Sequence, residues 1–540
     1  MRTDGGLMIR EPAPVHAHSP LPAVIACPAG DEGPNRTAIV DALGQYSWES
    51  FLTAAGACAL ALRESGPAGR VAIDCGRSFA YAAGFAGAVA ANWTAVPVDW
   101  SHGPGPRDDE TDIAAVITDR DDPRIPAGAQ RGNPALLRWP DLMTRSAGTS
   151  APGQLPLLGG YSMPTSGTTG AMKRVNISGA GLRSAISRFT AHAGLTAADR
   201  YLHVAAGTFS SSVRQLFAPL AAGAAVVVAE DHTRQDPAAL IELMRGERVT
   251  VLDGTPSLLR NLTFAAANGL VPDPFVGTLR QVICASEPLH DDDVERFRRA
   301  FGFTGSFQYF YGLTETAGLV GRAAGSGRTA PQAVPAVREL PVVREAFDTA
   351  MRALPECDIR VVDDRLDEVA DGDLGEVAVL TGTQDVYYED SPRATALLAM
   401  PCPWRAGARM IMTGDLAVRT GGGFRIVGRR DDVVKVRGQR VSLADLATAA
   451  RAAPGVADAA AVLVEGEFGS DIALFVEAAP GTETVRRIRK HLRGSVRVAA
   501  YPRYVTALPE LPRTRSGKPE LAALRVLAGS AGRQAPPGAV

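Results

Sequence analysis

Residues 201–230 read YLHVAAGTFSSSVRQLFAPLAAGAAVVVAE, and this stretch decides the fold class. An apolar run at 201–206 is followed by a helical pattern and then by a second apolar run that ends at 230. Short apolar runs that alternate with helical patterns are typical of a parallel sheet covered by helices. The stretch therefore predicts a strand, a helix and a second, parallel strand.

The same alternation extends over the first 300 residues, beginning with VAIDC at 71–75. Between about 355 and 428 the helical patterns fade, and runs such as GEVAVL are separated by Gly and Asp turns, which predicts an antiparallel β subdomain. We therefore expect an α/β protein with a large N-terminal domain of helix-covered mixed sheets plus a β subdomain at 1–430. A small α+β C-terminal domain is expected at 431–540.

Composition and charge exclude several classes of protein. Lys and Arg total 56 against 58 Asp and Glu, and this net charge of -2 lacks the basic excess of a nucleic-acid or anionic-membrane surface. The N-terminus lacks the apolar core of a secretory signal, and no apolar run approaches the roughly 18–20 residues of a membrane span. The 6 cysteines form no CxxC pair. We expect a cytoplasmic protein with no nucleic-acid partner.

The segment GYSMPTSGTTGAMKRV at 160–175 indicates a phosphate-binding loop. Glycines let backbone N–H groups converge on a phosphate, hydroxyls add donors, and a lysine supplies a compact positive charge. The segment is not a Walker loop, because the G-x-x-x-x-G-K-[ST] spacing is not met. The predicted phosphate-binding residues are Thr165, Ser166, Gly167, Thr168, Thr169, Gly170 and Lys173.

This loop resembles that of the adenylate-forming superfamily, which includes acyl-CoA synthetases, peptide-synthetase adenylation domains and luciferases. Further segments of the chain resemble the other motifs of the superfamily, in the same order. They are FYGLTETAG at 310–318, MTGDLAVR at 412–419, GRRDDVVKVRGQRV at 428–441 and RTRSGKPE at 513–520. Each segment alone is a common turn or salt-bridge element, but five in order across about 360 residues make the resemblance specific.

The resemblance implies ATP and Mg²⁺ as cofactors. Thr314 would bond a phosphate, Glu315 and Thr168 would hold the metal, and the Asp415 carboxylate would accept from both ribose hydroxyls. Gly312 would let the chain pass the adenylate closely. The implied catalytic residues are Lys518, Thr314 and Glu315. The implied nucleotide-binding residues are the loop residues above with Ala285, Ser286, Glu287, Tyr311, Gly312, Thr314, Asp415, Arg429 and Lys435.

The resemblance also implies that the C-terminal domain is a mobile lid. Asp431 would be the hinge, and rotation about it would bring Gly438 and Arg440 to a tunnel for the thiol of CoA or of a phosphopantetheinyl carrier protein. The chain ends 22 residues after Lys518, so we expect the acyl acceptor, either CoA, a separate acyl carrier protein or an amine, to come from outside.

The position of the acid substrate is also implied. By family position the pocket would be lined by Phe209, Ser210, Arg214, Val282, Cys284, Phe310 and Gly318. Amino-acid-activating relatives carry an aspartate where this chain has Ser210, so an α-amino acid would bury an unpaired ammonium. Arg214 lies four residues further on, and two interpretations stay open: a pocket cation that favours a second anionic or accepting group, or a solvated residue on the helix surface.

The leading hypothesis is an ATP-dependent ligase that activates a small carboxylic acid, aryl or dicarboxylic rather than α-amino. It would release pyrophosphate and transfer the acyl group to a thiol. The first alternative is an adenylating enzyme of natural-product biosynthesis with an amine acceptor, or with nitrite as the activated oxyanion, giving an amide or an N–N bond. A luciferase-like oxygenase and a degenerate nucleotide-binding module are further alternatives.

Overall fold

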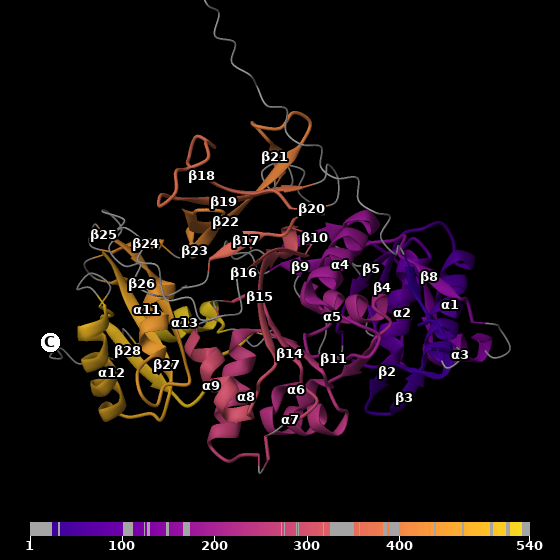
Figure 1. Cartoon of the computed structure of the whole chain (residues 1–540), viewed down its shortest axis with the longest axis horizontal. Helices are drawn as coiled ribbons and strands as arrows, with labels where there is room; N and C mark the ends of the chain where they lie inside the picture. Colours follow the sequence, from indigo (N-terminus) through magenta and orange to yellow (C-terminus); the bar gives the residue numbers. More distant parts are fainter. Residues whose placement is uncertain are drawn as a thin grey trace, which may run out of the picture.

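The structure is a computed structural model. The residues that it describes are 24–30, 33–100, 112–123, 125–126, 130–146, 151–165, 173–271, 273–274, 276–287, 289, 291–316, 318–323, 350–355, 357–381, 386–388, 399–430, 433–436, 439–466, 469–496, 501–514 and 519–531. These residues form helix-covered sheets followed by a smaller C-terminal unit, as the sequence predicts (Figure 1).

The first large sheet has the strand order β20-β10-β9-β5-β4-β6-β7, and the central strands are parallel. Helices α1 (Trp48–Glu64), α2 (Phe79–Ala90) and α3 (Trp139–Ser146) accompany it. Every residue of α2 is buried, which explains its alanine-rich sequence without a polar face. The strands are β4 (Arg70–Asp74), β5 (Thr94–Pro97), β6 (Ile113–Thr118), β7 (Gln130–Arg138), β9 (Tyr161–Thr165), β10 (Lys173–Ile177) and β20 (Val386–Tyr388). A separate two-stranded sheet consists of β1 (Val24–Ala26) and β8 (Gln154–Pro156).

The second large sheet contains both strands of the stretch at residues 201–230. Its parallel part runs in the order β2-β12-β11-β13-β14-β15, and β3 pairs antiparallel with β2 at the edge. The strands are β2 (Thr37–Asp41), β3 (Gly44–Ser47), β11 (Arg200–His203), β12 (Ala225–Val228), β13 (Val251–Gly254), β14 (Gln281–Cys284) and β15 (Ser306–Leu313). The helices are α4 (Gly179–Ala193), α5 (Ser210–Ala221), α6 (Asp231–Gln235), α7 (Pro237–Gly246), α8 (Pro256–Ala267) and α9 (Asp291–Phe301), with short 3-10 turns η1 (Gly33–Asn35) and η4 (Thr314–Thr316).

The predicted antiparallel β subdomain continues this sheet rather than forming a sheet of its own. Strand β16 (Gly318–Ala323) folds back on β15, and the order then continues β17-β23-β22-β19-β18. The remaining strands are β17 (Met351–Ala353), β18 (Ile359–Val362), β19 (Leu374–Thr381), β21 (Ala399–Pro401), β22 (Arg409–Thr420) and β23 (Gly423–Arg429). In Figure 1 strands β18, β19 and β21 lie toward the top, above helices α5 to α9.

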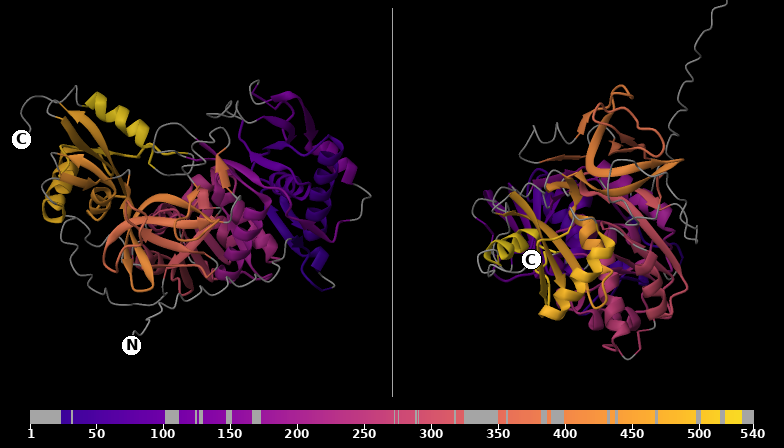
Figure 2. Two further views of the ribbon diagram at one scale, coloured as in Figure 1. Left: turned by 90° about the horizontal axis from the view of Figure 1, so that it is seen from above. Right: turned by 90° about the vertical axis from the view of Figure 1, so that its left-hand side faces the viewer.

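The C-terminal unit lies at one end of the molecule, beside α8 and α9 (Figures 1 and 2). Its helix α11 (Leu443–Arg451) packs on a sheet of order β26-β27-β28, and this unit has its own apolar core. The other elements are β24 (Val433–Val436), β25 (Gln439–Ser442), β26 (Asp458–Gly466), β27 (Gly469–Glu477), α12 (Thr482–Ser495), β28 (Tyr504–Leu508) and α13 (Leu521–Ala531). The predicted boundary at 430/431 has Asp431 outside the described residues. Across the described residues, no helix has the length and apolar character to cross a membrane.

Candidate active site

A cavity of about 1690 Å³ lies where the carboxyl ends of the parallel strands meet the C-terminal unit. Strands β13, β14 and β15 reach it at their ends, and the first turns of α5 and α8 face it. In open α/β sheets this edge is where ligands bind, because helix N-termini and loops converge there. Residues of the C-terminal unit, among them Arg451, Arg513 and Thr514, line the opposite side.

One part of the lining, here called the polar wall, consists of Glu287, Tyr311, Asp415 and Arg429. The Tyr311 hydroxyl donates to Asp415 Oδ2 at 2.6 Å, and Arg429 Nη1 lies 3.3 Å from Asp415 Oδ1. Asp415 and Arg429 pair directly across β22 and β23, so the sheet register brings them together. Burial, together with the neighbouring Asp415, raises the pKa of Tyr311 well above its ordinary value, which keeps the hydroxyl a donor. The wall thus presents a buried, oriented carboxylate.

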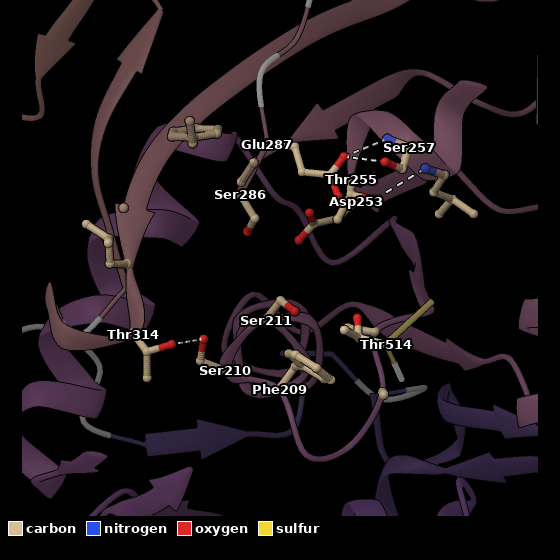
Figure 3. A pocket seen from close by; sticks show the side chains of 18 of the residues that line it. Phe209, Ser210, Ser211, Asp253, Thr255, Ser257, Ser286, Glu287, Thr314 and Thr514 are labelled. Carbon is tan, nitrogen blue, oxygen red and sulfur yellow. Dashed lines mark hydrogen bonds between the residues drawn. The ribbon is translucent and has the colours of Figure 1, made fainter. Parts of the chain in front are cut away.

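Glu287 leaves one carboxylate oxygen unused within the described residues. Its Oε2 accepts from the Ser257 backbone N–H at 3.0 Å and from Ser257 Oγ at 2.5 Å, at the first turn of α8 (Figure 3). Its Oε1 is buried and has no hydrogen-bond partner among these residues. The preceding residue, Ser286, has φ of 73°, a conformation that few non-glycine residues adopt. A buried acceptor without a partner fits a ligand that donates, such as a nucleobase amine.

Thr314 and Glu315 follow β15 in the short turn η4, and each contacts a different element. Thr314 Oγ1 lies 2.9 Å from Ser210 Oγ on the first turn of α5, and Figure 3 shows the two hydroxyls facing each other. The Tyr388 hydroxyl donates to Glu315 Oε1 at 3.2 Å. Tyr388 belongs to β20, which pairs with β10 at Val175. The turn is therefore tied both to the helix α5 and to the sheet that contains β9 and β10.

A second part of the lining, here called the aromatic wall, consists of Tyr161, Phe189, Phe310, Arg214 and Asp253. The rings of Phe189 and Phe310 meet edge to face with centroids 5.5 Å apart, and the Arg214 guanidinium lies 5.3 Å from the centroid of Phe189. Arg214 also forms a fork with Asp253, in which Nε and Nη2 donate to the two carboxylate oxygens at 2.9 Å each. The Arg214 side chain is 13% exposed, which excludes the solvated alternative that the sequence left open.

The structure corrects the expected positions of Val282 and Cys284. Both side chains are fully buried among residues of α7, α8 and α9, on the face of β14 that points away from the cavity. Because side chains alternate along a strand, Ile283 takes the other face and packs in the same core as Phe310. Ala285, just beyond the strand, lines the cavity.

The remaining predicted site residues divide into three groups. Those that line the cavity are Phe209, Ser210, Arg214, Ala285, Ser286, Glu287, Phe310, Tyr311, Gly312, Thr314, Glu315, Gly318, Asp415 and Arg429. Ser166, Gly167, Thr168, Thr169, Gly170, Asp431, Gly438 and Lys518 lie outside the described residues, and for Thr165, Lys173, Lys435 and Arg440 only the backbone is described. The backbones of Lys435 and Arg440 pair across β24 and β25.

Several lining residues were not predicted from the sequence. Asp253 ends a parallel strand, and the rule that ligands bind at the carboxyl ends of such strands could have found it. Arg513 donates to Asp458 at 3.0 Å and to Glu477 at 2.6 Å, and so joins the segment just before Lys518 to the paired ends of β26 and β27. Tyr388 carries no sequence signal, because its role depends on a pairing between distant strands.

Comparison with known proteins decides the family. Residues 159–383 match the AMP-binding enzyme family, and residues 446–518 match the AMP-binding enzyme C-terminal domain. The two matches cover more than half of the 540 residues. The chain belongs to the AMP-binding enzymes. It has both domains of these enzymes in the expected order, as its motifs predict.

Individual relatives of this AMP-binding enzyme agree. It is 32% identical over 375 residues to the isonitrile lipopeptide synthase of Streptomyces coeruleorubidus, a match that covers 68% of this chain but 24% of that protein. ATP-bound MatB from Rhodopseudomonas palustris has a TM-score of 0.74 at 24% identity, covering 93% of this chain and 98% of that one. The anthranilate CoA ligase AuaEII, in complex with anthranoyl-AMP, has a TM-score of 0.74 at 18% identity, covering 92% and 95%. The two structures show a shared fold.

Proposed function

We propose that this AMP-binding enzyme activates a small aryl carboxylic acid with ATP, releases pyrophosphate, and passes the acyl group from the acyl adenylate to a thiol. The acceptor is CoA or the phosphopantetheine of a separate carrier protein. The observation that carries the acid class is the aromatic wall, where the Phe189 and Phe310 rings lie beside an arginine that is already paired with a carboxylate. Aromatic side chains prefer edge-to-face or offset contacts with other rings, so the wall suits an aryl group.

The same wall is unsuited to an α-amino acid. An ammonium group taken from water into this cavity needs a charged partner, because burying it unpaired costs several kcal/mol. Ser210 offers a hydroxyl and no charge, and its Oγ contacts Thr314 at 2.9 Å. The Asp253 carboxylate already accepts from Arg214 and from the Tyr201 hydroxyl. The Arg214–Asp253 pair also argues against a dicarboxylic acid, because the charge of Arg214 is already balanced by Asp253.

The proposed chemistry has two steps. In the first, a carboxylate oxygen attacks the α-phosphorus of ATP, and the bond to the β-phosphate breaks so that pyrophosphate leaves. Negative charge gathers on the α-phosphate, where Lys518 and the Thr314 hydroxyl would stabilise it. In the second, the sulfur of the deprotonated thiol attacks the acyl carbon and AMP leaves. Asp415 would hold the ribose and so position the α-phosphate for the attack in the first step.

The residues fit a metal ion that is held mainly through the nucleotide. Mg²⁺ keeps several waters and binds through one or two carboxylates plus substrate phosphates, for which Glu315 supplies a carboxylate at the cavity surface. Within the described ranges, no group of three or more His, Cys, Asp or Glu side chains could hold a metal without substrate. The bound ion would offset phosphate charge. Thr168, the hinge Asp431 and the thiol tunnel at Gly438 and Arg440 remain part of this proposal.

A substrate panel tests the proposal. Substituted benzoic acids, aliphatic dicarboxylic acids, the common amino acids and nitrite are each mixed with ATP, Mg²⁺ and the full chain, with and without CoA, and pyrophosphate release is measured. We expect release with a benzoic acid and further AMP formation when a thiol is added. Release only with an amino acid, or only with nitrite and an arylamine, would overturn the proposal. Lys518→Ala gives the background, and Lys490→Ala, an exposed lysine of α12, is the matched control.

A further inference from the structure

We propose that Asp253 determines substrate specificity by pairing with Arg214, so that the aromatic wall accepts uncharged aryl groups and rejects acids that carry a second charge. The inference rests on the proposed function, because it takes the aromatic wall as the place where the acid binds. It goes further in naming the residue that sets the charge of that wall. Arg214 is then a cation of the pocket whose charge is balanced by Asp253, so it does not pair with an anionic group of the substrate.

The Arg214–Asp253 pair is held by several direct hydrogen bonds. Arg214 Nε and Nη2 donate to the two oxygens of Asp253 at 2.9 Å, and the Tyr201 hydroxyl donates to Oδ2 at 2.7 Å. The Asp253 side chain has no exposed surface. The Gln215 side chain donates to the Asp253 backbone carbonyl at 2.7 Å and fixes the strand end. A paired fork of this kind is the strongest arrangement between guanidinium and carboxylate.

The guanidinium of Arg214 keeps its positive charge in this setting. Burial opposes the charge on Arg214, but the neighbouring Asp253 overrides it, and the pKa of the guanidinium lies above its ordinary value. Burial, reinforced by Asp253, raises the pKa of Tyr201 well above its ordinary value, so its hydroxyl remains a donor. The three groups therefore carry one positive and one negative charge, which cancel.

The pair also lies where a substrate would meet it. Arg214 is one helical turn after Ser210 on α5, and Asp253 stands near the end of β13. Both line the cavity, and Figure 3 shows the Asp253 carboxylate directed toward the space above Ser211. The guanidinium also lies over the Phe189 ring. An aryl acid against this ring would place its ring substituents at the pair.

A second charge on the acid has no counterion at this wall. A second carboxylate would have to displace Asp253 from Arg214, and an ammonium would have to displace Arg214 from Asp253. Either displacement leaves a buried charge unpaired, which is the costly outcome for such pairs. A neutral hydroxyl or amino substituent can share a hydrogen bond with the pair without breaking it. The wall therefore selects by charge in both directions.

Two reciprocal variants test this in the full chain. Asp253→Asn keeps the shape and frees the guanidinium, whereas Arg214→Gln frees the carboxylate. Three probes are used: benzoate, benzene-1,3-dicarboxylate and 3-(aminomethyl)benzoate. Their dissociation constants are measured by titration calorimetry. We expect Asp253→Asn to raise the affinity for the dicarboxylate relative to benzoate at least tenfold, and Arg214→Gln to do the same for the aminomethyl acid. The double variant removes both charges and returns both ratios toward those of the wild type.

A control variant separates this effect from general damage. Glu247→Gln breaks another arginine–carboxylate pair, with Arg200 at 2.6 Å, whose residues do not line the cavity, and it leaves all ratios unchanged. Thermal unfolding confirms that each variant is folded, and either single variant tests the pair if the other does not fold. Unchanged ratios in a folded single variant overturn the inference. Absence of pyrophosphate release from the wild type with every benzoic acid overturns the proposed function alone, because the calorimetric ratios do not depend on turnover.

Discussion

Gly312 is a position where the addition of one methyl group is expected to disable the site. It lies on β15 opposite Leu319 of β16, two residues before Thr314. A Cβ at this position would lie 2.4 Å from the Gly318 carbonyl oxygen and 2.7 Å from the Leu319 Cα. Both are backbone atoms, so no rotamer change relieves the contact. Ordinary contact begins at 3.4 Å, and the strands must therefore separate by about 1 Å.

That displacement sets the expected magnitude. Overpacking of this kind costs about 1–3 kcal/mol of stability. A misplacement of about 1 Å in a catalytic group can cost on the order of 100-fold in rate. We therefore expect Gly312→Ala to fold, to unfold at lower urea concentration, and to form adenylate about 100-fold more slowly, because Thr314 and Glu315 follow directly on the strand.

The assay is ATP–pyrophosphate exchange with the acid identified by the panel, alongside urea unfolding. Gly321→Ala is the matched control on the same strand pair, since the nearest atom to its added Cβ is the Arg352 carbonyl oxygen at 3.2 Å, and a shift of a few tenths of an ångström suffices. We expect the control to keep its exchange rate within about threefold. A folded Gly312→Ala with an exchange rate near that of the wild type would refute the reasoning.

Three further outcomes are expected. Lys518→Ala lowers ATP–pyrophosphate exchange by about 100- to 1000-fold, the range for loss of a donor to developing charge, and an undiminished rate contradicts its catalytic assignment. Tyr388→Phe removes the donor to Glu315 at 3.2 Å, so the Mg²⁺ concentration for half-maximal exchange rises about tenfold in a magnesium titration. Burial opposes the charge on Asp199, but the Arg280 fork lowers the pKa of its carboxyl below the ordinary 3.8. The Asp199–Arg280 pair therefore contributes to the free energy of unfolding above about pH 4, and this contribution is lost as pH falls through the folded-state pKa of Asp199. When the free energy of unfolding is measured by urea titration at a series of pH values, Asp199→Asn shows a smaller decrease across this pH range than the wild type.

The sequence predicted the fold class and part of the cavity lining, because the alternating apolar and helical runs and the motifs are local patterns. The strands and helices of residues 201–230 follow from alternating apolar and helical runs, and the motif around Thr314 is contiguous. The prediction from sequence was wrong for Val282 and Cys284, which lie on the face of β14 that points away from the cavity. A strand buried on both sides is apolar throughout, so it shows no alternation from which the facing residue can be read. A shift of one residue then reverses the face.

Gly312 illustrates a different limit. The resemblance explains the glycine by close passage of the adenylate, and Gly312 does line the cavity. A side chain at this position would clash with the backbone of β16. This contact can be recognised only when the pairing of β15 with β16 is known. The motif was recognised, but the contact that requires it was not.

The sequence by itself indicated the family of this chain, because the predicted phosphate loop and the motifs around Thr314, Asp415 and Lys518 are short contiguous segments that resemble those of the adenylate-forming superfamily in the same order. Only the tertiary structure decided whether Arg214 is a free cation in the pocket. Its counterion, Asp253, lies 39 residues away on another element, and α5 and β13 come together only in the folded chain. The net charge of a pocket depends on which side chains packing brings into contact, and no local pattern around Arg214 specifies that partner.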